Sequence, residues 1–63
     1  MLPETYVVRQ VFWYGLLSLE SVYRMIDVEY PRQFTLVQRM GIVNQVLQSG
    51  WVHHSDNLLT SVD

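Results

Sequence analysis

Residues 30–55 carry the clearest structural signal in the chain, and they read YPRQFTLVQRMGIVNQVLQSGWVHHS. The stretch contains two Arg, two His and four Gln, but no Asp, Glu or Lys. Its apolar-periodic run leads into Ser49-Gly50-Trp51-Val52, and the polar loop Ser55-Asp56-Asn57 separates that run from the β-prone residues Leu58 to Val62. The pattern therefore predicts a long helix, a stop and a small β-hairpin.

This long helix can begin directly after Pro31 or at Thr35, whose spacing to Gln38 fits a capping box. Gly41 leaves two alternatives open, because a glycine inside a helix costs about 1 kcal/mol relative to alanine. Either Gly41 permits close packing within one long helix, or it forms the turn between two short helices. The predicted buried stripe consists of Leu36, Met40, Val43 and Leu47, with Val37 and Val46 beside it.

A first helix is predicted near the start of the chain, because Pro3 suits a first helical turn and Glu4 lies near the positive end of the helix dipole. The β-branched and aromatic residues 6–14 would also suit a strand, but helix is the preferred interpretation. Gly15 to Ser18 is predicted to be a connection. The apolar residues at helical spacings are Val7, Val8, Val11, Phe12 and Leu16.

A second helix is predicted to begin after Ser18, which is a favourable N-cap residue. Leu17 and Val22 occupy the positions of a hydrophobic staple around it. Pro31 restricts Tyr30 to extended geometry, so the helix should end before it. The apolar side of this helix consists of Leu19, Val22, Tyr23 and Ile26.

Length and composition limit the kind of protein this can be. The 63 residues, 49% of them hydrophobic, allow one small domain spanning residues 1–63. Such a chain buries only about 60% of its unfolded surface. There is no Cys to form a disulfide or a thiolate–zinc site. A homodimer would supply the missing burial, and a soluble, cytoplasmic protein is the default expectation. Residues 11–17 are apolar but too few for a membrane span, and Met1 to Glu4 lacks the positive charge of a signal peptide.

Charge is distributed unevenly along the chain. The net charge of −2 argues against a strongly basic nucleic-acid binder. Residues 1–29 also carry a net charge of −2, whereas residues 30–55 carry +2 from Arg32 and Arg39. Asp56 and Asp63 follow. This asymmetry would direct an anionic partner towards residues 30–55.

The order of elements resembles that of the winged helix-turn-helix superfamily. Ile42 to Val52 resembles the end of a recognition helix running into its wing, which would comprise residues 51–54 and 58–62. An alternative resemblance is to a compact helix-turn-helix, in which residues 36–42 form the first helix and the glycine turn. The winged form is preferred, because it leaves no element unused. The expected fold is mainly α with a short C-terminal β-hairpin, a three-helix winged-helix-like domain.

The resemblance implies that the third helix enters the major groove of double-stranded DNA. Arginines would contact phosphates or guanine, amide side chains would read adenine, and His53 would contact a phosphate from the wing. A solvated helix also uses Gln and Asn merely to stay soluble, and that reading competes with recognition. The residues expected to contact DNA are Arg32, Gln33, Gln38, Arg39, Asn44, Gln45, Gln48 and His53.

A protein-interaction module for dimerisation, adaptor or inhibitor function is the alternative, because the chain has many large rings for a small core. Tyr and Trp are enriched at interface hot spots. Phe12, Tyr23 and Trp51 are the rings expected to fill the core, rather than Trp13 or Tyr30. The expected partner-binding residues are Trp13, Tyr14, Tyr30 and Phe34.

Catalytic and metal-binding motifs are missing from the sequence. His53 and His54 are adjacent, and neighbouring residues on a strand point to opposite faces. There is no glycine-rich phosphate loop, nucleophile elbow or metal-ligand spacing. The sequence therefore favours a non-enzymatic transcription regulator that needs no cofactor, self-associates and binds DNA.

Overall fold

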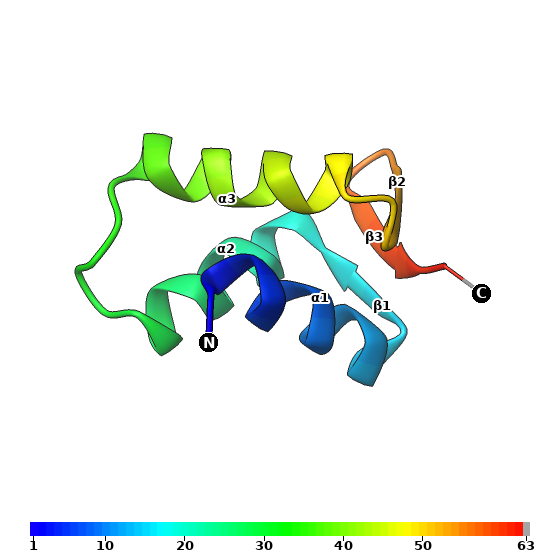
Figure 1. Ribbon diagram of the computed structural model, residues 1–63, viewed down its shortest axis with the longest axis horizontal. Coiled ribbons are helices and arrows are strands. Elements are labelled where there is room, and N and C mark those ends of the chain that lie inside the picture. The colour runs from blue at the N-terminus through cyan, green and yellow to red at the C-terminus, as the bar shows by residue number, and fades with distance from the viewer. Residues whose placement is uncertain (63) are drawn as a thin grey trace.

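The computed structural model describes residues 1–62, and Asp63 lies outside the described part. Three helices and three strands follow one another in the order α1-β1-α2-α3-β2-β3 (Figure 1). Helix α3 lies along one side of the molecule, α1 and α2 lie on the other side, and the sheet closes one end. This confirms the predicted fold class, mainly α with a short hairpin in a winged-helix-like arrangement. The elements are α1 (Pro3–Tyr14), β1 (Leu16–Ser18), α2 (Leu19–Glu29), α3 (Leu36–Gln48), β2 (Val52–Ser55) and β3 (Leu58–Ser61).

Side-chain caps set where α2 and α3 begin, as the sequence predicts. Ser18 Oγ accepts a hydrogen bond of 3.1 Å from the Ser21 backbone N–H at the start of α2. Thr35 and Gln38 form a complete capping box at the start of α3, with bonds of 2.8 and 3.1 Å. Helix α3 runs through Gly41 without interruption, so the single long helix is the correct alternative.

Loss of the Thr35 cap should be measurable, because the first turns of α3 contain no buried residue that could hold them in its place. Thr35→Ala is expected to lower the free energy of unfolding by about 1 kcal/mol. The measurement is urea denaturation followed by circular dichroism. Thr5→Ala is the control, since Thr5 lies exposed on α1 and makes no side-chain hydrogen bond within residues 1–62. An equal loss for both variants would contradict the capping role.

The three strands form one antiparallel sheet in the order β1-β3-β2. Strand β3 is central, with Leu59 opposite Leu17 on one side and opposite His54 on the other. The predicted hairpin is thus confirmed, with a two-residue turn formed by Asp56 and Asn57. The predicted connection at residues 15–18 is wrong in part, because Leu16–Ser18 pairs with β3 as strand β1.

The core lies between the three helices and one face of the sheet. On α3 it takes up only residues of the second half, so the predicted buried stripe is correct for Val43 and Val46 and wrong for the first half of the helix. Leu36, Val37 and Met40 are exposed, whereas Ile42 is buried. The first half of α3 contributes no buried residue to the core. The buried residues are Val7, Val11, Val22, Ile26, Ile42, Val43, Val46, Val52 and Leu59.

The rings are not placed as expected. Phe12 is 47% exposed and Trp51 is 60% exposed, so neither fills the core. The buried side of α1 is formed by Val7 and Val11, and Phe12 lies one position further round the helix. Tyr23 does pack against the core, and Tyr30, expected at the surface, is half-buried. None of the helices within residues 1–62 is both long and apolar enough to cross a membrane.

Candidate functional site

Three of the predicted DNA-reading side chains lie together on the second half of α3. Asn44, Gln45 and Gln48 are exposed there, and none makes a side-chain hydrogen bond within residues 1–62. At 100° per residue, Gln48 projects between the other two. Their amide groups are therefore free to bind a ligand in the surrounding solvent.

The arginines are not brought to these amides. Arg39 lies four residues before Val43 and seven before Val46, and so shares their inward stripe. It is half-buried, and its buried Nε has no hydrogen-bond partner within the described residues. Arg32 is exposed in the loop before α3, where its φ is 60°. The exposed side of α3 consequently has no cation of its own.

The remaining predicted DNA contacts are scattered. Gln38 uses its Oε1 to accept the Thr35 N–H, so this oxygen serves the cap. Gln33 is exposed in the loop, and its backbone N–H donates to the Tyr30 carbonyl over 3.2 Å. His53 is exposed on β2 opposite Thr60, and His54 lies on the other face opposite Leu59. The structure therefore assembles no continuous basic surface from these residues.

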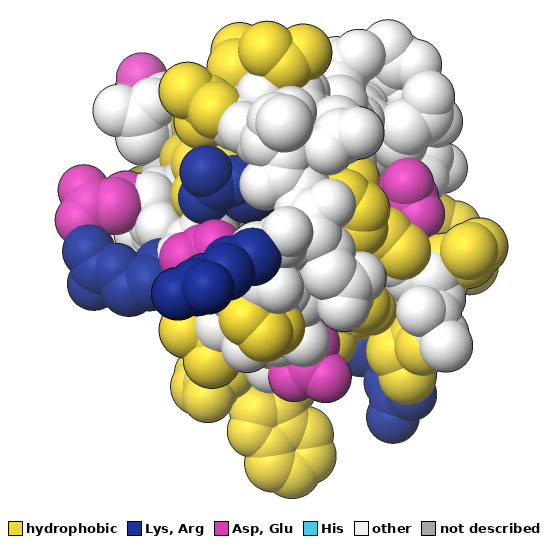
Figure 2. All heavy atoms as spheres, turned by 90° about the vertical axis from the view of Figure 1, so that its left-hand side faces the viewer, with side chains coloured by type: hydrophobic (Ala, Val, Ile, Leu, Met, Phe, Trp, Pro, Cys, Tyr) yellow, Lys and Arg dark blue, Asp and Glu magenta, His cyan; other side chains and the backbone are white. Residues whose placement is uncertain are grey.

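What the structure does assemble on α3 is an apolar surface, which we call the α3 face. Its residues project within one side of the helix, and Val37 is the most exposed at 77%. In Figure 2 hydrophobic side chains gather at the top of the molecule, over the beginning of α3, and the arginines visible from this side lie below them. The α3 face consists of Leu36, Val37, Met40, Gly41, Asn44 and Leu47.

A groove of about 420 Å³ runs beside the α3 face, between α3 and α2. Leu19 and Tyr23 of α2 form its far wall. Gly41 lies at its edge, and a Cβ added to Gly41 would meet no atom within 4 Å other than those of its chain neighbours and its own helix backbone. Packing within this chain thus gives no reason for a glycine at this position.

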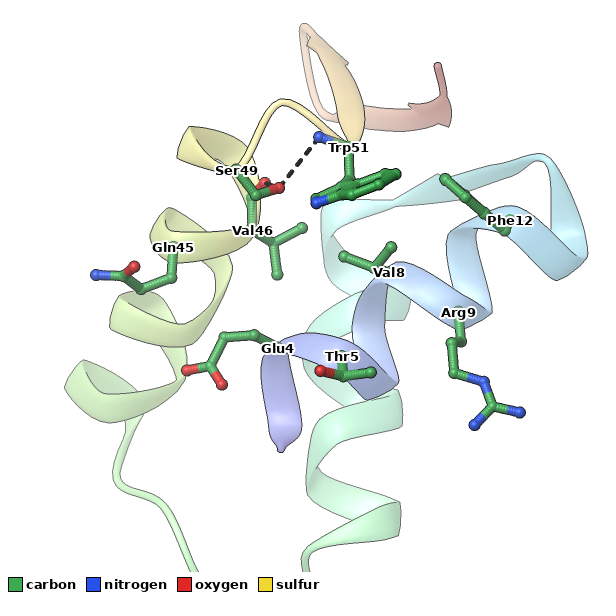
Figure 3. Close-up of a pocket in the computed structure, with 9 residues that line it drawn as sticks. All are labelled: Glu4, Thr5, Val8, Arg9, Phe12, Gln45, Val46, Ser49 and Trp51. Carbon is green, nitrogen blue, oxygen red and sulfur yellow. Dashed lines mark hydrogen bonds between the residues drawn. The ribbon is translucent and has the colours of Figure 1, made fainter. Parts of the chain in front are cut away.

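A second groove, also about 420 Å³, lies between α1 and α3 on another side of the molecule (Figure 3). The Trp51 indole lies near Val8 and Phe12, and its ring centroid is 6.5 Å from that of Phe12. Ser49 Oγ accepts the Trp51 backbone N–H over 3.1 Å and donates to the Val46 carbonyl over 2.6 Å. Glu4 and Arg9 line the groove from α1. This groove is partly apolar but has charged groups along one wall.

The four rings predicted to bind a partner fall into two groups. Trp13 and Tyr14 are exposed near the end of α1. Tyr30 and Phe34 instead pack against the core with centroids 5.6 Å apart, and the Tyr30 ring meets that of Tyr6 edge-on at 5.9 Å. Burial, followed by the charge of Glu29, raises the pKa of Tyr6. Because Tyr30 and Phe34 pack against the core, they stabilise the loop before α3.

Sequence reasoning missed the α3 face, because it assigned Leu36, Val37 and Met40 to the core stripe. A signal was available: α3 spans 13 residues and contains one charged residue, Arg39.

Comparison of the chain with protein-family models, with curated proteins and with solved structures gave no match.

Proposed function

We propose that this protein is a non-enzymatic protein-interaction module of the cytoplasm, which binds its partner through the α3 face. The observation that supports this is the contrast between two surface helices. Helix α3 exposes Leu36, Val37 and Met40 and has one charged residue, which points inward. Helix α2 is shorter and contains Glu20, Arg24, Asp27 and Glu29. The α3 face thus has the composition of a surface that another molecule covers.

The physical reason is the cost of hydrating apolar groups. Burying apolar surface is favourable by roughly 25 cal/mol per Å², so exposed apolar side chains that lie together favour association. Depletion of charged residues and enrichment in large apolar residues mark the centres of protein interfaces. Charged groups would have to be desolvated there, and the α3 face has none. A protein partner therefore fits this face better than a polyanion does.

DNA binding through α3 is the second candidate, and the exposed amides of Asn44, Gln45 and Gln48 favour it. Such side chains can form paired hydrogen bonds with adenine, each worth roughly 1–3 kcal/mol of discrimination. The difficulty is affinity, since most of it comes from cations that neutralise phosphates. With Arg39 turned inward, DNA binding would need arginines from a second subunit. As a transcription regulator, the protein would therefore act as part of a larger assembly.

A crosslinking experiment in the producing cell tests the proposed function. A photoreactive residue replaces Val37 on the α3 face in one variant and Val28 on α2 in the other. The two valines are matched, being 77% and 74% exposed on helices. A protein adduct of discrete mass is expected at position 37 and not at position 28. Equal labelling at both positions, or no protein adduct at 37, would exclude the α3 face as the contact surface.

The variant Val37→Lys separates the two candidates, because it shifts them in opposite directions. A lysine on the α3 face would strengthen DNA binding by adding a phosphate contact. The same lysine would weaken a protein contact by placing a charge in an apolar interface. The measurement is an amide chemical-shift titration with mixed-sequence duplex DNA at low and moderate salt. We expect Val37→Lys to bind this DNA no more tightly than the unmodified chain does, at either salt concentration.

A further inference from the structure

We infer that the partner of the α3 face is a second copy of this chain, bound across a two-fold axis with the two α3 helices antiparallel. This rests on the proposed function and specifies its partner. The axis passes beside Gly41, near the middle of α3. Each chain would then contribute the same α3 face, as a two-fold interface requires.

The first argument is the self-complementary shape of the α3 face. Leu36 and Val37 project at the beginning of α3, ahead of the groove. The groove lies beside residues 40–47 of the same helix, and Leu19 and Tyr23 form its far wall. Because projection and groove lie at opposite ends, an antiparallel pair places the projection of each copy against the groove of the other. Val37 of one copy then faces Leu47 of its partner.

The second argument is electrostatic. A two-fold axis brings identical surfaces together, so a charge close to the axis meets its own copy and is repelled. The α3 face contains no Asp, Glu, Lys or Arg, and its polar member, Asn44, can both donate and accept hydrogen bonds. The groove between α1 and α3 is not free of charged side chains, because Glu4 and Arg9 line it. Of the two grooves, the one beside the α3 face suits self-association.

Gly41 supplies the third argument. A glycine inside a helix lowers helix stability, and apart from its chain neighbours and the backbone of its own helix no atom lies within 4 Å of the Cβ that Gly41 lacks. On the outer side of α3 the missing Cβ would instead let a second helix approach closely. The spacing of Val37, Met40, Asn44 and Leu47 alternates between three and four residues, which is the spacing of a helix–helix seam.

The size of the chain gives a reason for pairing. Small domains are commonly stabilised by disulfides, a structural metal or oligomerisation. This chain has no Cys, and within residues 1–62 no three His, Asp or Glu side chains are grouped so that they could hold a metal ion. A typical interface takes about 800 Å² from each partner. An interface of this size would cover roughly a sixth of the 4503 Å² surface of one chain.

Sedimentation equilibrium over a wide range of protein concentration tests the inference. The unmodified chain should pass from 7.5 kDa to twice that mass as the concentration rises. Val37→Lys and Gly41→Leu are each expected to raise the dissociation constant at least tenfold. The matched control Val28→Lys should leave it unchanged within twofold. Circular dichroism of the dilute monomers checks that each variant is folded, and Gly41→Leu removes a helix-destabilising residue.

The outcomes separate this inference from the proposed function. A monomer at all concentrations, or a dimer indifferent to both α3 substitutions, would overturn the inference. If position 37 nevertheless crosslinks to a different protein, the proposed function stands with another partner. If no protein adduct forms at position 37, both fail.

For a dimer, nuclear Overhauser effects between Val37 of one labelled copy and Leu47 of the other are expected, and contacts between two Val37 side chains would refute the antiparallel arrangement.

Discussion

Leu59→Ala is expected to remove a large part of the stability of the protein at 25 °C. Leu59 is completely buried at the centre of β3, the strand that pairs with both β1 and β2. Truncating a buried leucine to alanine costs roughly 2–5 kcal/mol in typical cores. A chain of this length has a total stability of roughly 3–9 kcal/mol, at about 0.05–0.15 kcal/mol per residue. Urea denaturation followed by circular dichroism, at one fixed protein concentration, measures the loss.

The neighbouring residue provides a matched control. Leu58 lies on the same strand, points to the other face of the sheet and is 42% exposed. Leu58→Ala removes the same atoms from a site where water already reaches them, so its cost should be far smaller. If the two variants were equally stable, Leu59 would not occupy the centre of the core.

Gly50→Ala and Gly41→Ala are expected to have effects of opposite sign. Gly50 has a φ of 82°, where a Cβ clashes with the backbone at a cost of roughly 1–2 kcal/mol. Gly41 is helical and has open space around it, so alanine there should raise the stability by about 1 kcal/mol. Both free energies are measured by urea denaturation of dilute protein, where the chains are monomeric.

The pair of glycine variants isolates the effect of backbone conformation on stability. The substitution is the same at both positions, and at either glycine no atom beyond the adjacent backbone and chain neighbours lies within 4 Å of the Cβ position. Only the backbone conformation differs, because Gly50 is left-handed and Gly41 is helical. Equal effects of the two substitutions would mean that the turn before Trp51 does not hold Gly50 in the left-handed region.

Local signals made the helices predictable. Ser18 and Thr35 act through groups three residues away, and Pro31 acts on its immediate neighbour, so both partners of each interaction stand close together in the sequence. Strand β1 gave no such signal. It is three residues long, and its conformation comes from pairing with β3, which is about forty positions later in the chain. Nothing adjacent to Leu17 indicates this pairing.

The candidate site was predictable only in part. Asn44, Gln45 and Gln48 are exposed on α3 as expected from their polarity. Arg39 was grouped with them because it is charged, although its spacing to Val43 and Val46 places it on the inward stripe. Val37 is exposed because it lies on the side of α3 away from the buried Ile42 and Val46, and which side of a helix faces the core is a property of the tertiary arrangement. Helical periodicity alone could not distinguish a core stripe from an interface stripe.

The sheet order has a consequence for synthesis on the ribosome. Its central strand, β3, is made after both of its neighbours, and the Asn57 carbonyl that accepts the Leu19 N–H over 2.8 Å is made just before it. Until Leu59 leaves the exit tunnel, β1 and β2 have no strand to pair with. The apolar sides of α1 and α2 must meanwhile stay exposed to water. The nascent chain therefore depends on β3 to close the core, and this domain folds only after β3 has been translated.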